Sequence, residues 1–148
     1  FWLLNTDTVV HRDALSALVG RARRDGHLGM VGSTIRWYDR PGFIQCMGGA
    51  RLDPRTVDAH HVGEGEPVEA LGVRAAEAER ELSYVMGASM LVSSRFVREV
   101  GPMQEDYFLY FEEMDWAVRS RGRFALGYAP DSHVFHKSGA TSSSVVRE

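Results

Sequence analysis

The sequence predicts an α/β fold in which helices cover a β-sheet. Apolar runs with the character of strands alternate along the chain with segments whose apolar residues recur at helical spacing. Neither an internal repeat nor a linker rich in proline, glycine and serine divides the chain. A length of 148 residues suits one domain with a substantial core. We therefore expect a single domain over residues 1–148.

Composition excludes several classes of protein. Three Trp, seven Phe and five Tyr, with an apolar content of 44%, argue against a disordered chain. No apolar run approaches the roughly 20 residues that a helix needs to cross a membrane. Cys46 is the only cysteine, which excludes a disulfide framework and a cysteine-based zinc site. The net charge of −3 argues against nucleic acid as the main partner.

The first elements follow from the hydrophobic pattern. The apolar run of residues 1–4 predicts a buried strand, and the polar residues 5–8 predict a turn after it. Residues 12–24 predict a helix, because their apolar side chains share one face and Gly26 can end it. Residues 28–38 predict a second strand.

The middle of the chain is less regular. Residues 43–52 are typical of a hairpin that is interrupted at Gly48-Gly49. Residues 53–69 contain several Pro, Gly and His residues and predict a mobile surface loop. Residues 70–81 are charged and rich in alanine, so a short helix and further loop are both compatible with them.

The run of residues 81–92 predicts a strand with both faces covered, because it is too apolar for a half-solvated one. Ser94 is placed to cap a short helix over residues 95–100, which would end at Gly101.

The last elements predict one helix and two strands. Residues 111–121 form a helical pattern that Gly122 would end. Residues 124–128 and 133–136 predict short strands separated by a turn at 129–131, compatible with an antiparallel arrangement at an edge of the sheet.

Asn5, Thr6 and Asp7 follow a buried strand directly. Ligands of open α/β sheets bind at the carboxyl ends of strands. Asp7 is therefore in a position where it could bind a cation or lie near a phosphate. The alternative is that these polar residues only form the turn.

Residues 105–116 hold five carboxylates and five aromatic side chains among twelve positions. On a helix, Glu112, Asp115 and Trp116 share one face, Glu113 points away from it, and Arg119 can form an i,i+4 ion pair with Asp115. Carboxylates beside aromatic side chains lose solvent, which raises their pKa and suits a general base. The alternative is an amphipathic helix with solvated acids at its N-terminus.

Histidines give a weaker signal. His133 and His136 are three positions apart on an expected strand, so they point to opposite faces and do not easily share a metal ion. His60 and His61 lie in the expected surface loop, where solvation is the simpler interpretation. A zinc site built from these four histidines is therefore disfavoured.

The resemblance to a known family rests on four segments: residues 3–8, 86–92, 100–119 and 128–139. Taken together and in this order, they resemble the second half of the catalytic domain of family 2 glycosyltransferases, closest to the rhamnosyltransferase-like branch. The resemblance implies a partial GT-A fold that lacks the N-terminal nucleotide-binding strands, so the strand at residues 1–4 would be central in the family's sheet. It also implies that the chain is part of a longer protein.

The resemblance implies a role for each matching residue. Asp7 matches the last position of the family's Asp-x-Asp metal motif, and Asn5 matches the first, where it would contact the donor. His136 matches a histidine that completes the metal shell. Glu112 and Glu113 match the family's acidic pair, of which the second, Glu113, would be the catalytic base. The remaining implied residues would bind the acceptor: Gly87, Ala88, Asp106 and Trp116.

The implied reaction is an inverting transfer of a sugar from a nucleotide-diphosphate-sugar donor to an acceptor hydroxyl, with Mn²⁺ or Mg²⁺ as cofactor. The partners would be the nucleotide sugar and a glycan or lipid-linked acceptor, in polysaccharide or secondary-metabolite glycan biosynthesis. The resemblance implies a cytoplasmic location, with the inner face of the membrane as an alternative site of action.

Two other functions compete with this one. A catalytically silent carbohydrate-binding or assembly domain would keep the same scaffold, and self-association through an exposed sheet edge would fit it. A metal-dependent hydrolase would use the acidic cluster, but the sequence lacks a second dense cluster of His and Asp.

Overall fold

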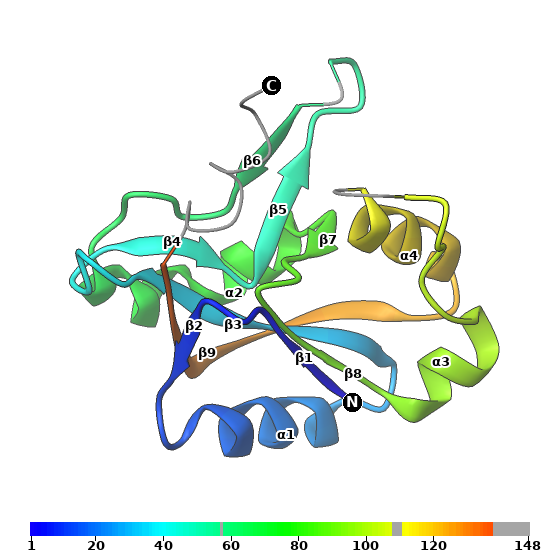
Figure 1. The fold of residues 1–148 in the computed structure, drawn as a ribbon, viewed down its shortest axis with the longest axis horizontal. Helices are drawn as coiled ribbons and strands as arrows, with labels where there is room; N and C mark the ends of the chain where they lie inside the picture. The colour runs from blue at the N-terminus through cyan, green and yellow to red at the C-terminus, as the bar shows by residue number, and fades with distance from the viewer. Residues whose placement is uncertain (57, 108–110, 138–148) are drawn as a thin grey trace.

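The computed structural model describes residues 1–56, 58–107 and 111–137 and is arranged around strand β3 (Leu28–Trp37) (Figure 1). Strands β8 (Ser89–Val92) and β4 (Ile44–Met47) pair antiparallel with β3, and β9 (Ala125–His136) pairs parallel with it. The α/β class that the sequence predicts is confirmed.

The edges of this larger sheet are short strands. Strand β1 (Trp2–Leu4) pairs antiparallel with β8, and β2 (Thr8–Val10) pairs antiparallel with β9. The strand order is β1-β8-β3-β9-β2. The sequence pattern predicts β1 but misses β2, which is only three residues long.

Strand β9 corrects two expectations. Residues Ala125–His136 form one strand in place of two, and this strand lies inside the sheet, parallel to β3. Its register changes after Ala129, which pairs with Ser33, while the next pair is Thr34 with His133. The expected turn is therefore a bulge that contains Pro130, which suits a proline because this residue has no N–H to give to a ladder.

Helices cover both faces of the sheet (Figure 1). Leu18 of α1 (Ala14–Arg24) packs with Val31 of β3 on one face. Met30 of β3 packs on the other face with Phe96 of α3 (Ser94–Val100) and Trp116 of α4 (Glu112–Ser120). Residues 28–35 of β3 are all buried as a result.

Helices α2 and α3 settle two expectations. Residues Leu71–Glu81 form α2, so the helical alternative for this segment is confirmed; its Ala78 packs with Tyr128 of β9. The cap of α3 is Ser93 rather than Ser94, because the Ser93 hydroxyl accepts the Phe96 N–H at 3.1 Å.

The expected hairpin over residues 43–52 is wrong. Strand β5 (Gly49–Leu52) leaves β4 and joins a smaller sheet, between β6 (Ala59–His61) and β7 (Tyr84–Val85). Gly48 makes the bend with φ of 81°, a backbone conformation that residues with a Cβ seldom adopt.

Two further expectations change with the smaller sheet. The segment 53–69 is not all loop, since it contains β6 and begins a 3₁₀ helix at Val68–Ala70. The single strand expected over 81–92 is wrong, because residues 86–88 turn between β7 in the smaller sheet and β8 in the larger one.

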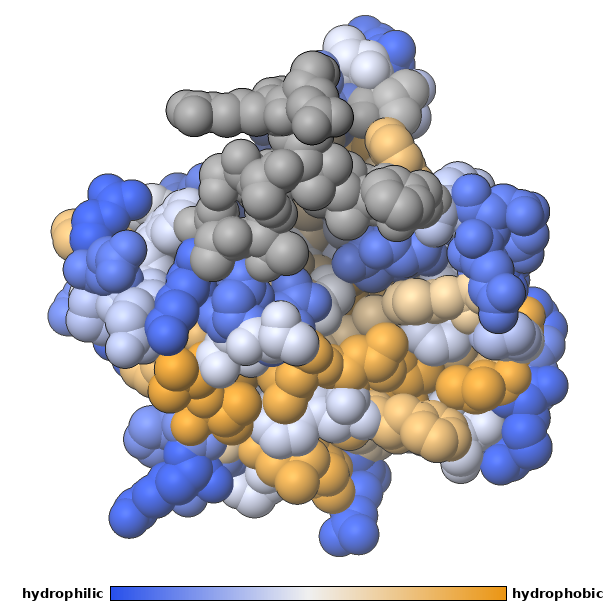
Figure 2. All heavy atoms as spheres, in the orientation of Figure 1, coloured by the Kyte–Doolittle hydropathy of each residue, from blue (hydrophilic) through white to orange (hydrophobic). Residues whose placement is uncertain are grey.

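Apolar side chains are exposed along β1, β2 and α1. Figure 2 shows an apolar band across the face of the molecule that carries these elements. Its exposed members are Phe1, Leu4, Val9, Val10 and Leu15. In the described part of the chain β1 pairs with β8 alone, so its other edge is open. No helix in these residues is long and apolar enough to cross a membrane.

Glu79 of α2 joins both helical layers around the edge of β9. Its carboxylate accepts the backbone N–H of Tyr128 at 2.6 Å and the Arg21 guanidinium of α1 at 2.7 and 3.2 Å. We expect Glu79→Ala to lower the free energy of unfolding by about 1–3 kcal/mol, because it leaves a strand N–H and a half-buried arginine without partners.

Urea unfolding measures this loss. Glu77→Ala is the matched control, since Glu77 lies on the same helix but makes an exposed ion pair with Arg74. A Glu79→Ala variant no less stable than Glu77→Ala would contradict the role of this bridge.

Candidate functional site

A pocket of about 310 Å³ lies between the end of β1, the β7–β8 connection and the start of α4. It brings together Asn5, Gly87, Glu112 and Glu113, which are far apart in the sequence. The other lining residues are apolar: Leu3, Leu4, Met90 and Met103. The sequence analysis did not predict these four residues as part of a site. The pocket lining thus combines two carboxylates and an amide with apolar side chains.

The two carboxylates stand in the first turn of α4. Phe111 precedes the helix with φ of 70°, and its carbonyl accepts the Asp115 N–H at 2.8 Å. Acidic side chains at a helix N-terminus are favoured by the helix dipole. Glu113 was expected to point away from the face of Glu112, yet both side chains line the pocket.

The environment of Glu113 raises its pKa above the ordinary value for glutamate. Burial is the main cause, and the neighbouring Glu112 acts in the same direction. The backbone N–H groups of Glu113 and Gly87 oppose this shift, because they favour the ionised carboxylate. A carboxylate with a raised pKa beside a pocket has the property that a general base requires.

Glu112 is less well satisfied than its neighbour. Its Oε2 atom is buried and, among the residues that the structure describes, finds no hydrogen-bond partner. A buried acceptor without a partner costs stability, so this oxygen is available to a donor group that enters the pocket.

Asp7 and His136 meet near the pocket. The Nε2 atom of His136 lies 3.2 Å from Oδ1 of Asp7, and both side chains are largely buried. His136 is held from behind, because its Nδ1 lies 2.9 Å from Oε1 of Gln45. The backbone also joins these strands, since Lys137 N–H donates to the Asp7 carbonyl at 3.0 Å. Asp7 is two residues from Asn5, so this pair and the pocket belong to one region.

The chemistry of this pair fits a divalent cation. A carboxylate oxygen and an imidazole nitrogen are ligands that Mn²⁺ accepts, and cis ligands of an octahedral ion lie about 3 Å apart. Gln45 plays the part of the outer partner that fixes the ring of a metal-binding histidine. Within residues 1–56, 58–107 and 111–137, no group of three or more His, Cys, Asp or Glu side chains could hold a metal. Asp7 and His136 would therefore need further ligands besides the His, Cys, Asp and Glu side chains of these ranges.

The other histidines lie elsewhere. The ring of His133 lies 6.3 Å from that of His11, on the opposite face of β9 from His136, as strand alternation predicts. Burial lowers the pKa of His133, with the nearby Arg36 and His11 adding to the effect. His60 is exposed, and His61 lies 3.7 Å from Glu64.

Trp116 was expected to bind an acceptor, but the structure places it in the core. Its ring packs edge-on against Phe96 with centroids 5.1 Å apart, and its Nε1 donates to the Gly101 carbonyl at 2.9 Å. Trp116 lies one turn after Glu112, on the side of α4 that faces the sheet. It does not line the pocket.

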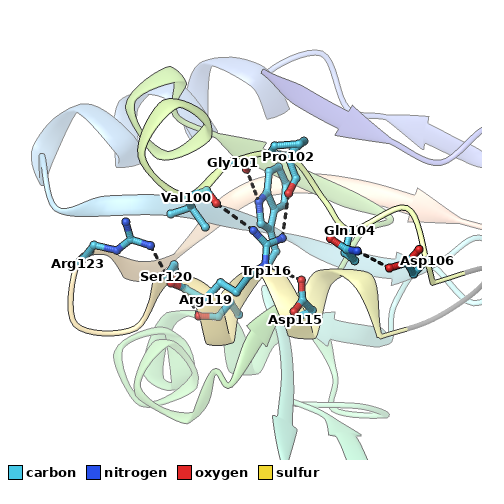
Figure 3. Close-up of polar contacts among 11 residues, drawn as sticks. Val100, Gly101, Pro102, Gln104, Asp106, Asp115, Trp116, Arg119, Ser120 and Arg123 are labelled. Carbon is cyan, nitrogen blue, oxygen red and sulfur yellow. Dashed lines mark hydrogen bonds and ion pairs between the residues drawn. The ribbon is translucent and has the colours of Figure 1, made fainter.

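Ala88 and Asp106 also lie outside the pocket lining. The side chain of Ala88 is buried with Ala14 and Ile35, although its carbonyl accepts the Asn5 N–H at 3.2 Å. Asp106 is exposed and accepts a hydrogen bond from Gln104 (Figure 3).

Arg119 holds the segment that leads to Met103. The ion pair with Asp115 is confirmed at 2.7 Å, but the guanidinium also donates to the carbonyls of Val100 at 3.0 Å and Pro102 at 2.9 Å (Figure 3). With Trp116, it ties residues 100–102 to α4 and so places Met103 at the pocket. Helical spacing predicts the ion pair but gives no signal for these longer contacts.

No known family model matches the sequence, and no curated protein matches it either.

The raised pKa of Glu113 predicts how stability depends on pH. The folded protein holds this proton more tightly than the unfolded chain does, so the contribution is complete below the ordinary glutamate pKa and is lost as pH rises through the folded value. We expect Glu113→Gln to melt at a higher temperature than the parent protein at neutral pH, with the difference shrinking toward about pH 4.

Thermal unfolding across this pH range measures the effect. Glu105→Gln is the control, because Glu105 is exposed. A Glu113→Gln variant that melts below the parent protein at neutral pH would show that burial does not dominate at this carboxylate.

Proposed function

We propose that this chain carries the metal-binding and acceptor-binding side of an inverting, metal-dependent glycosyltransferase of family 2 with the GT-A fold. One observation carries the proposal: Asp7, in contact with His136, is two residues along the chain from Asn5, which lines a pocket with Glu112 and Glu113. These residues come from distant parts of the sequence, and the resemblance assigns all of them to one reaction.

Asp7, His136 and Asn5 form the donor side of the proposed site. Asp7 and His136 would hold Mn²⁺ or Mg²⁺, and Asn5 would contact the donor through a neutral amide. When bound, the cation would offset negative charge on the diphosphate leaving group. Gln45 keeps the imidazole of His136 turned toward Asp7, so the pair is arranged before any ligand binds.

Glu113 is the proposed base. Its carboxylate removes the proton of the acceptor hydroxyl as that oxygen forms a bond to the anomeric carbon of the donor sugar. The bond from this carbon to the diphosphate breaks on the opposite face, which inverts the configuration in one displacement. The unsatisfied oxygen of Glu112 offers a hydrogen-bond acceptor to a second hydroxyl of the acceptor.

Sheet topology also supports the finer assignment to the GT-A fold. In the family that the sequence resembles, the strand before the metal motif is central in the sheet. The corresponding β1 pairs with β8 and offers an open edge on its other side, where the family has nucleotide-binding strands. The motif residues follow the carboxyl end of β1, where α/β sheets bind ligands.

A second candidate function is a catalytically silent carbohydrate-binding or assembly domain. The exposed apolar side chains along β1 and β2 favour it, because an open edge with apolar neighbours is a surface for pairing with another chain. The two functions differ in whether Glu113 is needed for turnover, which the next variant tests.

In the complete gene product, we expect Glu113→Gln to lower the rate of sugar transfer by roughly 10²–10⁴-fold, the usual contribution of a general base. Glutamine keeps the size of the side chain but cannot take the proton, so the KM for the donor should stay unchanged. The assay measures transfer from nucleotide-diphosphate sugars to hydroxyl acceptors.

Glu112→Gln is the matched control in the same turn of α4. If it abolishes transfer while Glu113→Gln remains active, the base is Glu112. If a transferring protein tolerates both changes, or if the parent protein transfers no sugar, the catalytic proposal fails and the binding or assembly function takes its place.

We expect Mn²⁺ to bind at Asp7 and His136 without any donor present. Gln45→Ala should weaken this binding by about 10–100-fold, since it removes the outer partner of His136, and Asp7→Ala should weaken it at least as much. Electron paramagnetic resonance of the free ion measures the affinity. His133→Ala is the control on the same strand, and an equal loss in that variant would contradict the site.

A further inference from the structure

Gly87 stands in direct contact with the carboxylate of Glu113. A Cβ atom built on Gly87 would lie 2.2 Å from Oε1 of Glu113 and 3.1 Å from its Cδ atom. These distances leave no room for any side chain at position 87 unless the carboxylate moves. The backbone of Gly87 does not require glycine, since it is not among the glycines with positive φ. The first group that a side chain at position 87 would meet is therefore the Glu113 carboxylate, the end of a flexible side chain that must move to admit it.

The backbone around Gly87 is fixed from two sides. Met86 donates its N–H to the Gly48 carbonyl at 3.2 Å, which ties the segment to the bend between β4 and β5. On the other side, the Ala88 carbonyl accepts the Asn5 N–H at 3.2 Å. The same short segment thus contacts Asn5 on the donor side and Glu113 on the acceptor side.

We propose that Gly87 is a positioning residue that sets where the Glu113 carboxylate lies in the pocket. Its bare Cα provides the space for the carboxylate, and its backbone N–H faces the same group. Because residues 86–88 are also bound to Asn5, they fix the place of the base relative to the donor turn. The catalytic meaning of this inference rests on the proposed function, whereas the contact itself does not.

Among the described residues, the titratable groups coupled to Glu113 are Glu112 on its own helix and Tyr84 on β7. Glu113 contributes to the raised pKa of Tyr84, although burial is the larger cause. The Glu113 carboxylate thus has neighbours on β7, on the connection from β7 to β8 and in the first turn of α4.

The first experiment needs no activity. In an NMR titration of the whole chain, the Gly87 amide resonance should shift with pH, with a midpoint above the ordinary pKa of glutamate. The Gly20 amide is the control, because nothing lies within 4 Å of a Cβ built at that position. In Glu113→Gln the shift of Gly87 should disappear. A Gly87 amide that does not follow Glu113 would overturn the inference.

The second experiment displaces the carboxylate. Gly87→Ala should push Glu113 from its niche into the pocket, so the Glu113 pKa should fall toward its ordinary value. It should also lower the melting temperature, and this loss should be much smaller in a Glu113→Ala background, where the contact is already gone. Gly20→Ala is the matched control. An unchanged or higher Glu113 pKa, or an equal loss of stability in both backgrounds, would overturn the inference.

Transfer assays separate this inference from the proposed function. In the complete gene product, Gly87→Ala should lower kcat by about 10²-fold, as a misplaced base would, and leave the KM for the donor unchanged. If the NMR results hold but no sugar is transferred, the proposed function fails and the positioning role stands. If Glu113→Gln abolishes transfer while Gly87→Ala matches Gly20→Ala in kcat, Gly87 has no positioning role and the proposed function stands.

Discussion

The close approach of three backbone segments at Gly32, Gly48 and Gly49 is the constraint on which the site depends. A Cβ atom on Gly32 would lie 2.0 Å from the Gly48 carbonyl oxygen, and one on Gly49 would lie 2.0 Å from that of Tyr84. Because these positions carry no side chain, the bend after β4 can lie on β3 while β7 lies on β5. The chain then passes from β7 to β8 at Gly87, directly beside α4. A larger residue at Gly32 or Gly49 would push the two sheets apart and move Gly87, which lines the pocket, away from Glu113.

The proposed site is costly to fold and is stabilised by its surroundings. Two adjacent carboxylates at the start of α4 are partly withdrawn from water, and one of their oxygens lacks a partner in the described residues. The opposite end of the same interface compensates, because Trp116 and Arg119 satisfy three consecutive carbonyls of the segment before α4. Burial and hydrogen bonding there hold the helix in place, so the carboxylates cannot relieve their repulsion by moving the whole first turn. The start of α4 thus destabilises the fold, and the contacts of Trp116 and Arg119 offset this cost.

Local pattern predicts much of this fold but little of its pairing. Apolar runs identify β1 and β3, and helical spacing identifies α1 and α4 within a few residues, whereas the run over 81–92 predicts one strand where the chain forms β7 and β8. Periodicity reports whether a segment is buried, not which strand lies beside it, so the parallel place of β9 and the separation of β4 from β5 could not be read from it. The site divides in the same way. The resemblance selects Asp7, His136 and Glu113, whereas Gln45, Met103 and the core position of Trp116 depend on contacts between distant segments.

The bulge in β9 fixes the parity of the strand. Before it, Tyr128 pairs with Gly32 and its side chain lies on the α2 side; after it, His136 pairs with Trp37 and its side chain lies on the side of Asp7. Both are even-numbered positions, and they reach opposite faces only because an odd number of residues, 130–132, is looped out of the ladder. A shift of residues 133–136 by one position against β3 would turn His136 away from Asp7. A deletion within residues 130–132 that the bulge absorbed would keep His136 paired with Trp37, and therefore on the same face. The bulge thus lets this strand change length without turning the histidine, a tolerance that a continuous strand lacks.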